Sequence, residues 1–149
     1  MSMFLILPPV MISATEYARL AEIATRARQR QGIGQVADTL LYELSRAHVL
    51  PADAVMRDIV GMHCTFEHQD VETSVTSRNF LAYPGEEHLY LGAVSVLSPL
   101  GTAAIGMRSG SSIPWKTTSG QNRALGVLRG LEPRHADWQQ ASRLFRSVH

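Results

Sequence analysis

Residues 93–115, AVSVLSPLGTAAIGMRSGSSIPW, decide the fold of this chain. The apolar residues before position 98 predict the end of a buried strand. Ser98 and Pro99 then predict a short helix, because serine caps a helix N-terminus and proline fits the first helical position. Gly106 and Gly110 allow the chain to reverse, and residues 113–115 begin another strand. The segment therefore predicts the order strand, capped helix, glycine turn and strand.

This order, with its Ser-Pro-Leu-Gly helix start, resembles the C-terminal domain of the bacterial Gre transcript-cleavage factors and of their short Rnk-type members. The resemblance covers residues 10–131 and implies an FKBP-like antiparallel sheet domain. It also implies that the protein binds RNA polymerase at the rim of the secondary channel. The residues that match the family's contact motif are Leu97, Ser98, Pro99 and Gly101.

The composition is that of an ordinary globular chain of 149 residues, with 45% apolar and 18% charged residues. A net charge of +1 argues against a concentrated basic face for duplex nucleic acid, so nucleic acid is expected only within a transcription complex. The single cysteine, Cys64, excludes a disulfide within the chain. Residues 3–7 fit neither a signal peptide nor a membrane span, so we expect a cytoplasmic protein with no membrane partner.

Residues 13–50 predict an antiparallel helical hairpin, a short coiled coil. Ser13 and Glu16 form a capping box at the start of its first helix. The glycines in residues 32–34 predict a tight connection, and a second helix is expected over 35–48. About 18 residues in the first helix, at 1.5 Å each, would extend the hairpin roughly 27 Å beyond the sheet domain.

The fold class expected from the whole chain is α+β. A short edge strand is expected at residues 10–12, before the hairpin. Residues 58–131 are expected to form an FKBP-like antiparallel sheet domain with one short helix, because apolar residues there follow a period of two. The segments expected in this domain are strands at 59–66 and 71–82 with a turn at 68–70 between them, the strand before Ser98, and a hairpin of 113–117 with 124–131.

Residues 133–149 predict a C-terminal helix, which the family resemblance does not include. Its apolar residues at helical spacing are Trp138, Ala141, Phe145 and Val148. We expect this stripe to pack on the chain's own sheet or on a second copy. The protein is therefore expected to be a monomer or a weak homo-oligomer through this helix.

The expected hairpin tip carries Arg26, Arg28, Arg30 and Gln31. In Gre factors, acidic residues at this place hold a Mg²⁺ ion at the polymerase active centre. Here no carboxylate lies between Glu22 and Asp38, and guanidinium groups cannot ligate Mg²⁺. We therefore predict no catalytic residue, no stimulation of RNA cleavage and competition with Gre factors. A solvated helix end near the C-terminal dipole explains the same arginines without any partner.

Other kinds of site find little support in the sequence. His63, Cys64 and His68 are close enough to suggest zinc, but no second pair of ligands follows, so no metal and no cofactor are expected. Prolyl isomerase activity needs an aromatic-lined pocket, for which the sheet region offers Phe66, Phe80, Tyr83, Tyr90 and Trp115. The alternatives to a polymerase-binding regulator are thus an enzyme or cleavage accessory and a self-associating interaction module.

Overall fold

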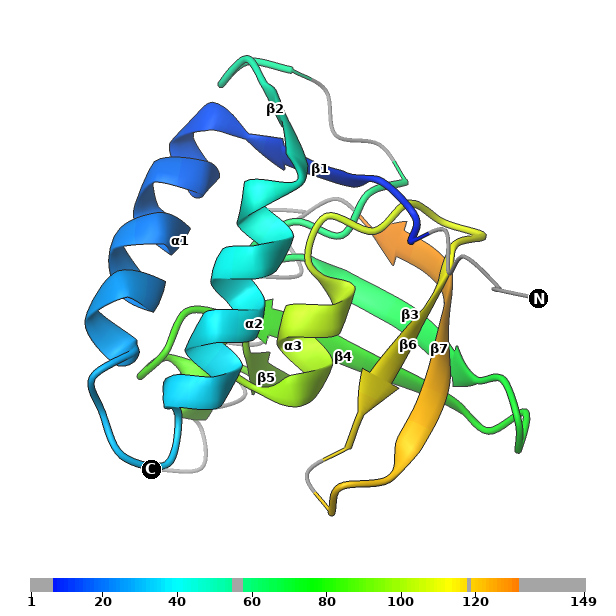
Figure 1. Ribbon diagram of the computed structural model, residues 1–149. Coiled ribbons are helices and arrows are strands. Elements are labelled where there is room, and N and C mark those ends of the chain that lie inside the picture. Colours follow the sequence, from blue (N-terminus) through cyan, green and yellow to red (C-terminus); the bar gives the residue numbers. More distant parts are fainter. Residues whose placement is uncertain (1–6, 55–57, 118, 132–149) are drawn as a thin grey trace, which may run out of the picture.

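The computed structural model describes residues 7–54, 58–117 and 119–131. Its elements are β1 (Val10–Ser13), α1 (Ala14–Ala27), α2 (Gly34–Ser45), β2 (Ala47–Leu50), β3 (Thr65–Asp70), β4 (Thr76–Ala82), the 3-10 turn η1 (Glu87–Leu89), β5 (Ala93–Ser95), α3 (Pro99–Ala104), β6 (Ser112–Lys116) and β7 (Asn122–Leu131). Figure 1 shows the α1–α2 hairpin beside α3, which lies in front of the main sheet. The α+β class with a helical hairpin is confirmed, while the helix expected over 133–149 lies outside the described residues.

The main sheet has five strands in the order β5-β4-β3-β7-β6. β3 pairs antiparallel with β4 and β7, and β6 pairs antiparallel with β7, as the predicted hairpin of 113–117 with 124–131 requires. β5 instead runs parallel to β4, with Phe80 opposite Ala93. The expectation of a wholly antiparallel sheet is therefore wrong at this edge, because the chain returns through η1 before β5 begins.

The strand expected at 59–66 is wrong, because β3 begins only at Thr65. Asp58 and His63 have positive φ angles of 61° and 56°, which interrupt extended backbone. The segment between them is held by single hydrogen bonds, such as Val60 N to Met107 O at 2.9 Å. Its apolar side chains are buried without a strand, which explains why their pattern was misleading.

The turn after β3 lies further along the chain than expected. β3 continues to Asp70, and the residues 71–75 connect it to β4. The Asp70 carboxylate accepts hydrogen bonds from the amides of Glu72 at 2.9 Å and Thr73 at 3.2 Å. Ser74 takes a φ of 60°. An aspartate that caps its own turn thus ends β3, where the predicted turn at 68–70 would have ended it earlier.

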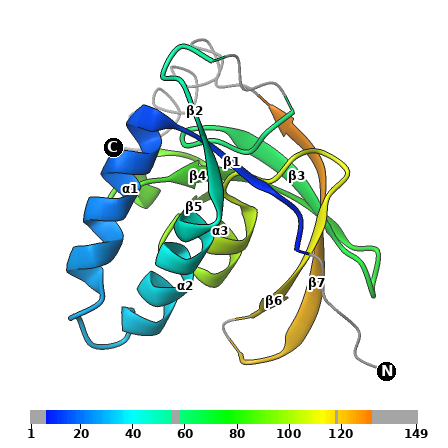
Figure 2. The ribbon, with the colours of Figure 1, turned by 45° about the horizontal axis from the view of Figure 1, so that its top comes forward.

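A second, two-stranded sheet closes the base of the hairpin. β1 pairs parallel with β2, with Val10 opposite Ala47, and Figure 2 shows these strands side by side. α2 therefore ends at Ser45 and not near His48. The Arg46 side chain strengthens this junction, because Nη1 donates to the Pro8 carbonyl at 2.6 Å and Nη2 lies 2.6 Å from the Glu43 carboxylate.

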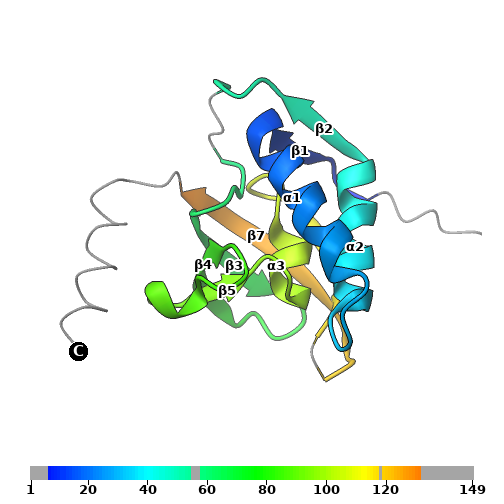
Figure 3. The same ribbon diagram turned by 90° about the vertical axis from the view of Figure 1, so that its left-hand side faces the viewer.

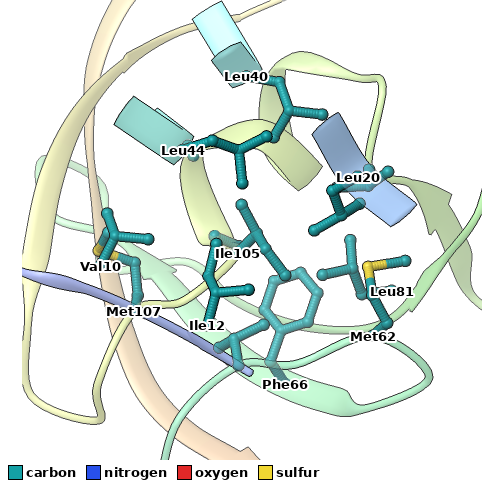
Figure 4. Packing of buried hydrophobic residues seen from close by; sticks show 14 of the residues in the cluster. Val10, Ile12, Leu20, Leu40, Leu44, Met62, Phe66, Leu81, Ile105 and Met107 are labelled. Atoms are coloured by element: carbon teal, nitrogen blue, oxygen red, sulfur yellow. The ribbon is translucent and has the colours of Figure 1, made fainter. Parts of the chain in front are cut away.

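The helical hairpin packs against the sheet domain and does not extend from it. Leu20 of α1 and Leu40 of α2 lie in the same buried cluster as Phe66 of β3, as Figure 4 shows. In Figure 3, α3 lies between α2 and the sheet. α1 has 14 residues, or about 21 Å at 1.5 Å each. The expected reach of 27 Å beyond the domain is wrong, because burial of apolar surface holds both helices against the core that they share with the sheet.

Candidate partner-binding site

The corner between β5 and α3, defined here as residues 95–102, is built around two serine hydroxyl groups. Ser98 Oγ accepts a hydrogen bond from Gly101 N at 3.0 Å and donates one to the Ser95 carbonyl at 2.6 Å. Ser95 Oγ accepts from Leu97 N at 3.0 Å. These bonds satisfy backbone groups that the end of a strand and the start of a helix leave open. The predicted helix start at Ser98 and Pro99 is confirmed.

Gly101 brings α3 against the end of β5. A Cβ atom at this position would lie 2.1 Å from the Ser95 carbonyl oxygen and 2.8 Å from Val96 Cα. The buried Thr102 adds a hydrogen bond from Oγ1 to the Val96 carbonyl at 2.8 Å. Gly101 is itself buried, so it shapes the corner and offers no surface to a partner. This packing role replaces the direct contact expected for it.

The outer surface of the corner is formed by Leu97, Ser98, Pro99 and Leu100, which are all half-buried. Leu97 and Leu100 pack part of their surface against the main core. The corner has no charged side chain in its sequence. It therefore presents a small apolar surface on a rigid backbone, which suits contact by shape complementarity.

The hairpin tip places its arginines in exposed ion pairs. Arg26 Nη2 lies 3.0 Å from Glu22 Oε1, and Arg28 Nε lies 2.8 Å from Asp38 Oδ1. Arg30 and Gln31 are exposed in the connection between the helices. The two carboxylates nearest the tip are thus occupied by arginines of the hairpin itself. Such exposed pairs are weak and do not order the surrounding chain.

A polar and aromatic cluster that the sequence did not reveal joins α1 to the sheet domain. His63 Nε2 lies 2.8 Å from Glu86 Oε1, which also accepts a hydrogen bond from Tyr83 N at 3.1 Å. The His63 ring lies 5.9 Å from the ring of Phe80 and meets the Tyr83 ring edge-on at 5.4 Å. The positive φ of His63 turns its side chain into this cluster, and residue spacing carries no signal for that.

Two groups beside this cluster have shifted pKa values. Burial raises the pKa of the Glu16 carboxyl above its usual 4.5, although the amide of Met62, 3.0 Å away, favours the ionised form. Burial also raises the pKa of Tyr83 above its usual 10, and the charge of Glu16 adds to the effect. Glu16 therefore does more than complete a capping box, because it joins the first turn of α1 to residues 61–62.

The structure brings together no metal site within its described residues. These residues contain no group of three His, Cys, Asp or Glu side chains that could hold an ion. Cys64 is buried, and His68 Nε2 lies 2.7 Å from Asn79 Oδ1.

The ring centroids of Phe80 and Tyr90 are 4.5 Å apart, and both residues are buried, so they do not line an open pocket. Among the residues that the structure describes, no helix is long and apolar enough to cross a membrane.

Comparison with known proteins identifies the family. The sequence model described as "Transcription elongation factor, GreA/GreB, C-term" matches residues 55–129, which is half of the chain. The chain belongs to the GreA/GreB family. The match includes the whole corner and both His63, before β3, and Glu86, after β4, whereas the helical hairpin precedes it. The family resemblance drawn from residues 93–115 is thereby confirmed.

Individual relatives show how far the likeness extends. The Regulator of nucleoside diphosphate kinase from Escherichia coli (strain K12) is 30% identical over 93 residues, which are 62% of this chain and 68% of that protein. Transcription elongation factor GreA from Nitratidesulfovibrio vulgaris is 30% identical over 112 residues, 70% of each chain. The solved structure of a GreA/GreB factor from Nitrosomonas europaea covers 84% of this chain and 99% of its own, with a TM-score of 0.63 and 24% identity. This last likeness shows the fold.

Proposed function

We propose that this protein regulates transcription by binding RNA polymerase at the rim of its secondary channel, without enzymatic activity of its own. The observation that carries the proposal is the corner, which lies inside the family match and holds Leu97, Ser98 and Pro99 on a rigid backbone. A surface that is already ordered loses little conformational entropy when a partner binds.

The direct contact is assigned to Leu97, Pro99 and the exposed part of Ser98. Ser98 also caps α3, so a bulky residue there would damage the helix start together with the surface. Pro99 is the better position to test, because it is half-buried and has no amide hydrogen to lose. A glutamate at this first helical position is compatible with the helix dipole.

The test is the affinity of purified core RNA polymerase for the protein and for two variants. Pro99→Glu should weaken binding at least tenfold, because it buries a carboxylate at the contact. Pro114→Glu, which puts the same charge on an exposed proline of β6, is the matched control and should bind like the parent. Equal affinity of the parent and a folded Pro99→Glu variant would overturn the assignment of the corner.

The absence of cleavage activity is proposed from the chemistry of the hairpin. Among the described residues, the carboxylates that flank the tip, Glu22 and Asp38, are paired with arginines of the same hairpin. The hairpin is also packed along the sheet domain, which limits how far its tip extends. Neither feature supports delivery of a Mg²⁺ ligand to a distant active centre.

A backtracked elongation complex tests this second part. The protein alone should leave the RNA uncut, and rising amounts of it should reduce cleavage stimulated by a Gre factor. The Pro99→Glu variant should compete less well than the parent. RNA cleavage by the protein alone would contradict the proposal, whatever the result of the binding experiment.

A further inference from the structure

A surface groove of about 300 Å³ lies between α1 and the turn that follows β4, and no residue of the corner lines it. Its lining consists of Arg19, Glu22, Ile23 and Arg26 from α1 and of Tyr83 and Pro84 from the turn. Ligand pockets range from roughly 300 to 1,000 Å³, so this groove suits one large side chain better than a whole small molecule. Ile23, Tyr83 and Pro84 supply the apolar surface that such a side chain needs.

The charges around the groove favour an aromatic occupant. Arg19 is exposed, and its guanidinium carbon lies 3.7 Å from the centroid of the Tyr83 ring. A planar guanidinium group has two faces, and the Tyr83 ring covers one of them. Indole is the ring that binds such a cation best. Arg26 Nη2 lies 3.0 Å from Glu22 Oε1, so these two charges compensate each other. A neutral aromatic side chain therefore fits the groove better than a charged one.

The main sheet ends close to this groove. Leu131, the last residue of β7, pairs with Thr65, the first residue of β3. Because the two strands are antiparallel, β7 points toward the residues that precede β3. One of these is His63, whose ring meets the Tyr83 ring edge-on at 5.4 Å, and Tyr83 lines the groove. The end of β7 is therefore separated from the groove by only a few side chains.

The sequence after β7 supplies a fitting side chain within reach. Residues 132–149 lie outside the described residues, and their first large apolar side chain is Trp138. Seven residues of chain beyond Leu131 reach up to about 23 Å when extended. One strand spacing of about 5 Å and two strand residues of about 7 Å lead from Leu131 to His63, whose ring contacts Tyr83. Trp138 can therefore reach the groove without any change in the sheet.

We infer that the indole of Trp138 occupies this groove in the same chain, against Ile23 and Pro84 and beside the Arg19 guanidinium group. A side chain tethered to the same sheet has a local concentration in the millimolar range, which favours it over the Trp138 of a second copy. Because α1 and the turn both line the groove, the docked indole ties the helical hairpin to the sheet domain. The site is independent of the corner, so it neither requires nor supports the polymerase contact assigned above.

The experiment uses the full chain labelled with ¹⁵N. Trp138→Ala should shift the Ile23 and Tyr83 amide signals, because it removes a ring that lies against them. Gln139→Ala, at the next position of the same segment, is the matched control and should leave both signals in place. The loss of one indole signal in Trp138→Ala also assigns the Trp138 indole. That signal should keep its position over a twentyfold range of protein concentration, because the contact lies within one chain.

A pair of variants tests the same contact from the side of the groove. Ile23→Gln removes apolar surface from the groove and should move the Trp138 indole signal toward its position in urea. Val36→Gln, at a half-buried residue of α2 outside the groove, should leave the signal in place, and thermal melts check that both variants are folded. The inference is wrong if the Ile23 and Tyr83 amides do not respond to Trp138→Ala or if Ile23→Gln and Val36→Gln act alike. It is also wrong if the indole signal depends on protein concentration, which would place Trp138 on a second copy.

Discussion

The corner and the hairpin tip, both of which stand out in the sequence, are built by opposite means. At the corner, serine hydroxyls bind backbone groups at 2.6–3.0 Å and Gly101 leaves no space for a side chain. At the tip, the arginine side chains are 58% and 80% exposed, and they pair directly with carboxylates that are themselves exposed to solvent. The corner is therefore a fixed surface and the tip an adaptable one, which favours the corner as the principal contact with a partner.

The strongest test of this comparison is Gly101→Ala. The new methyl group would meet the Ser95 carbonyl oxygen at 2.1 Å, and neither backbone segment can move without breaking the cap. We expect the free energy of unfolding to fall by at least about 2 kcal/mol, measured by urea denaturation.

Gly126→Ala is the matched control, because its Cβ would meet Val71 Cγ2 at 3.6 Å, which is ordinary contact. It should change the free energy of unfolding by less than about 1 kcal/mol. If both variants unfold at the same urea concentration, α3 is not held as tightly as the contact distance implies.

Ser98→Ala should have the next largest effect. It removes the cap of α3 and the bond to the Ser95 carbonyl, with an expected loss of about 1 kcal/mol in the same denaturation experiment. Ser98→Thr keeps a hydroxyl and should recover most of this loss. A Ser98→Ala variant as stable as the parent would mean that Pro99 and Gly101 define the corner without the cap.

Glu16, at the base of the hairpin, extends the comparison to a carboxyl group that is half-buried and not exposed. Its pKa is raised in the folded state, so its contribution to stability is complete below pH 4.5 and is lost as the pH rises through the folded-state pKa. Glu16→Gln should remove this part of the pH dependence of the free energy of unfolding. Glu22→Gln, at an exposed position of the same helix, is the matched control for the loss of a carboxyl group.

Arg28→Gln should have the smallest effect. The pair with Asp38 is exposed and screened by salt, so the free energy of unfolding should change by less than about 0.5 kcal/mol. Thermal melts at 20 mM and 500 mM salt, compared with those of Asp38→Asn, measure it. A loss as large as that of Ser98→Ala, at either salt concentration, would show that the tip is as rigid as the corner.

Much of the fold could be predicted from local chemistry. Ser13 and Ser98 both accept hydrogen bonds from amides three residues later, as capping residues do. The strand pair around Gly120 also formed as expected, because a glycine with a φ of 86° suits a reversal there. Such features depend on neighbours in the chain, so the amino-acid pattern contains them.

The errors lie where distant segments compete for the backbone. The apolar pattern of residues 59–66 predicted a strand, but their amides bond to Met107 and Leu81 through turns at Asp58 and His63. The pairing of β1 with β2 likewise joins residues 37 positions apart. Periodicity reports which side chains are buried, and it does not report which distant backbone groups satisfy the hydrogen bonds.

By itself, the sequence determined the elements whose hydrogen bonds close within a few residues: the capped start of α3, the helical hairpin and the absence of acidic residues between Glu22 and Asp38. It also carried enough of the family pattern in residues 93–115 to indicate a Gre-type fold. Only the tertiary structure decided that the hairpin lies against α3, that Gly101 is buried, and that Arg19 meets Tyr83. These features depend on apolar burial and contact between segments far apart in the chain, and no local pattern specifies which segments will meet.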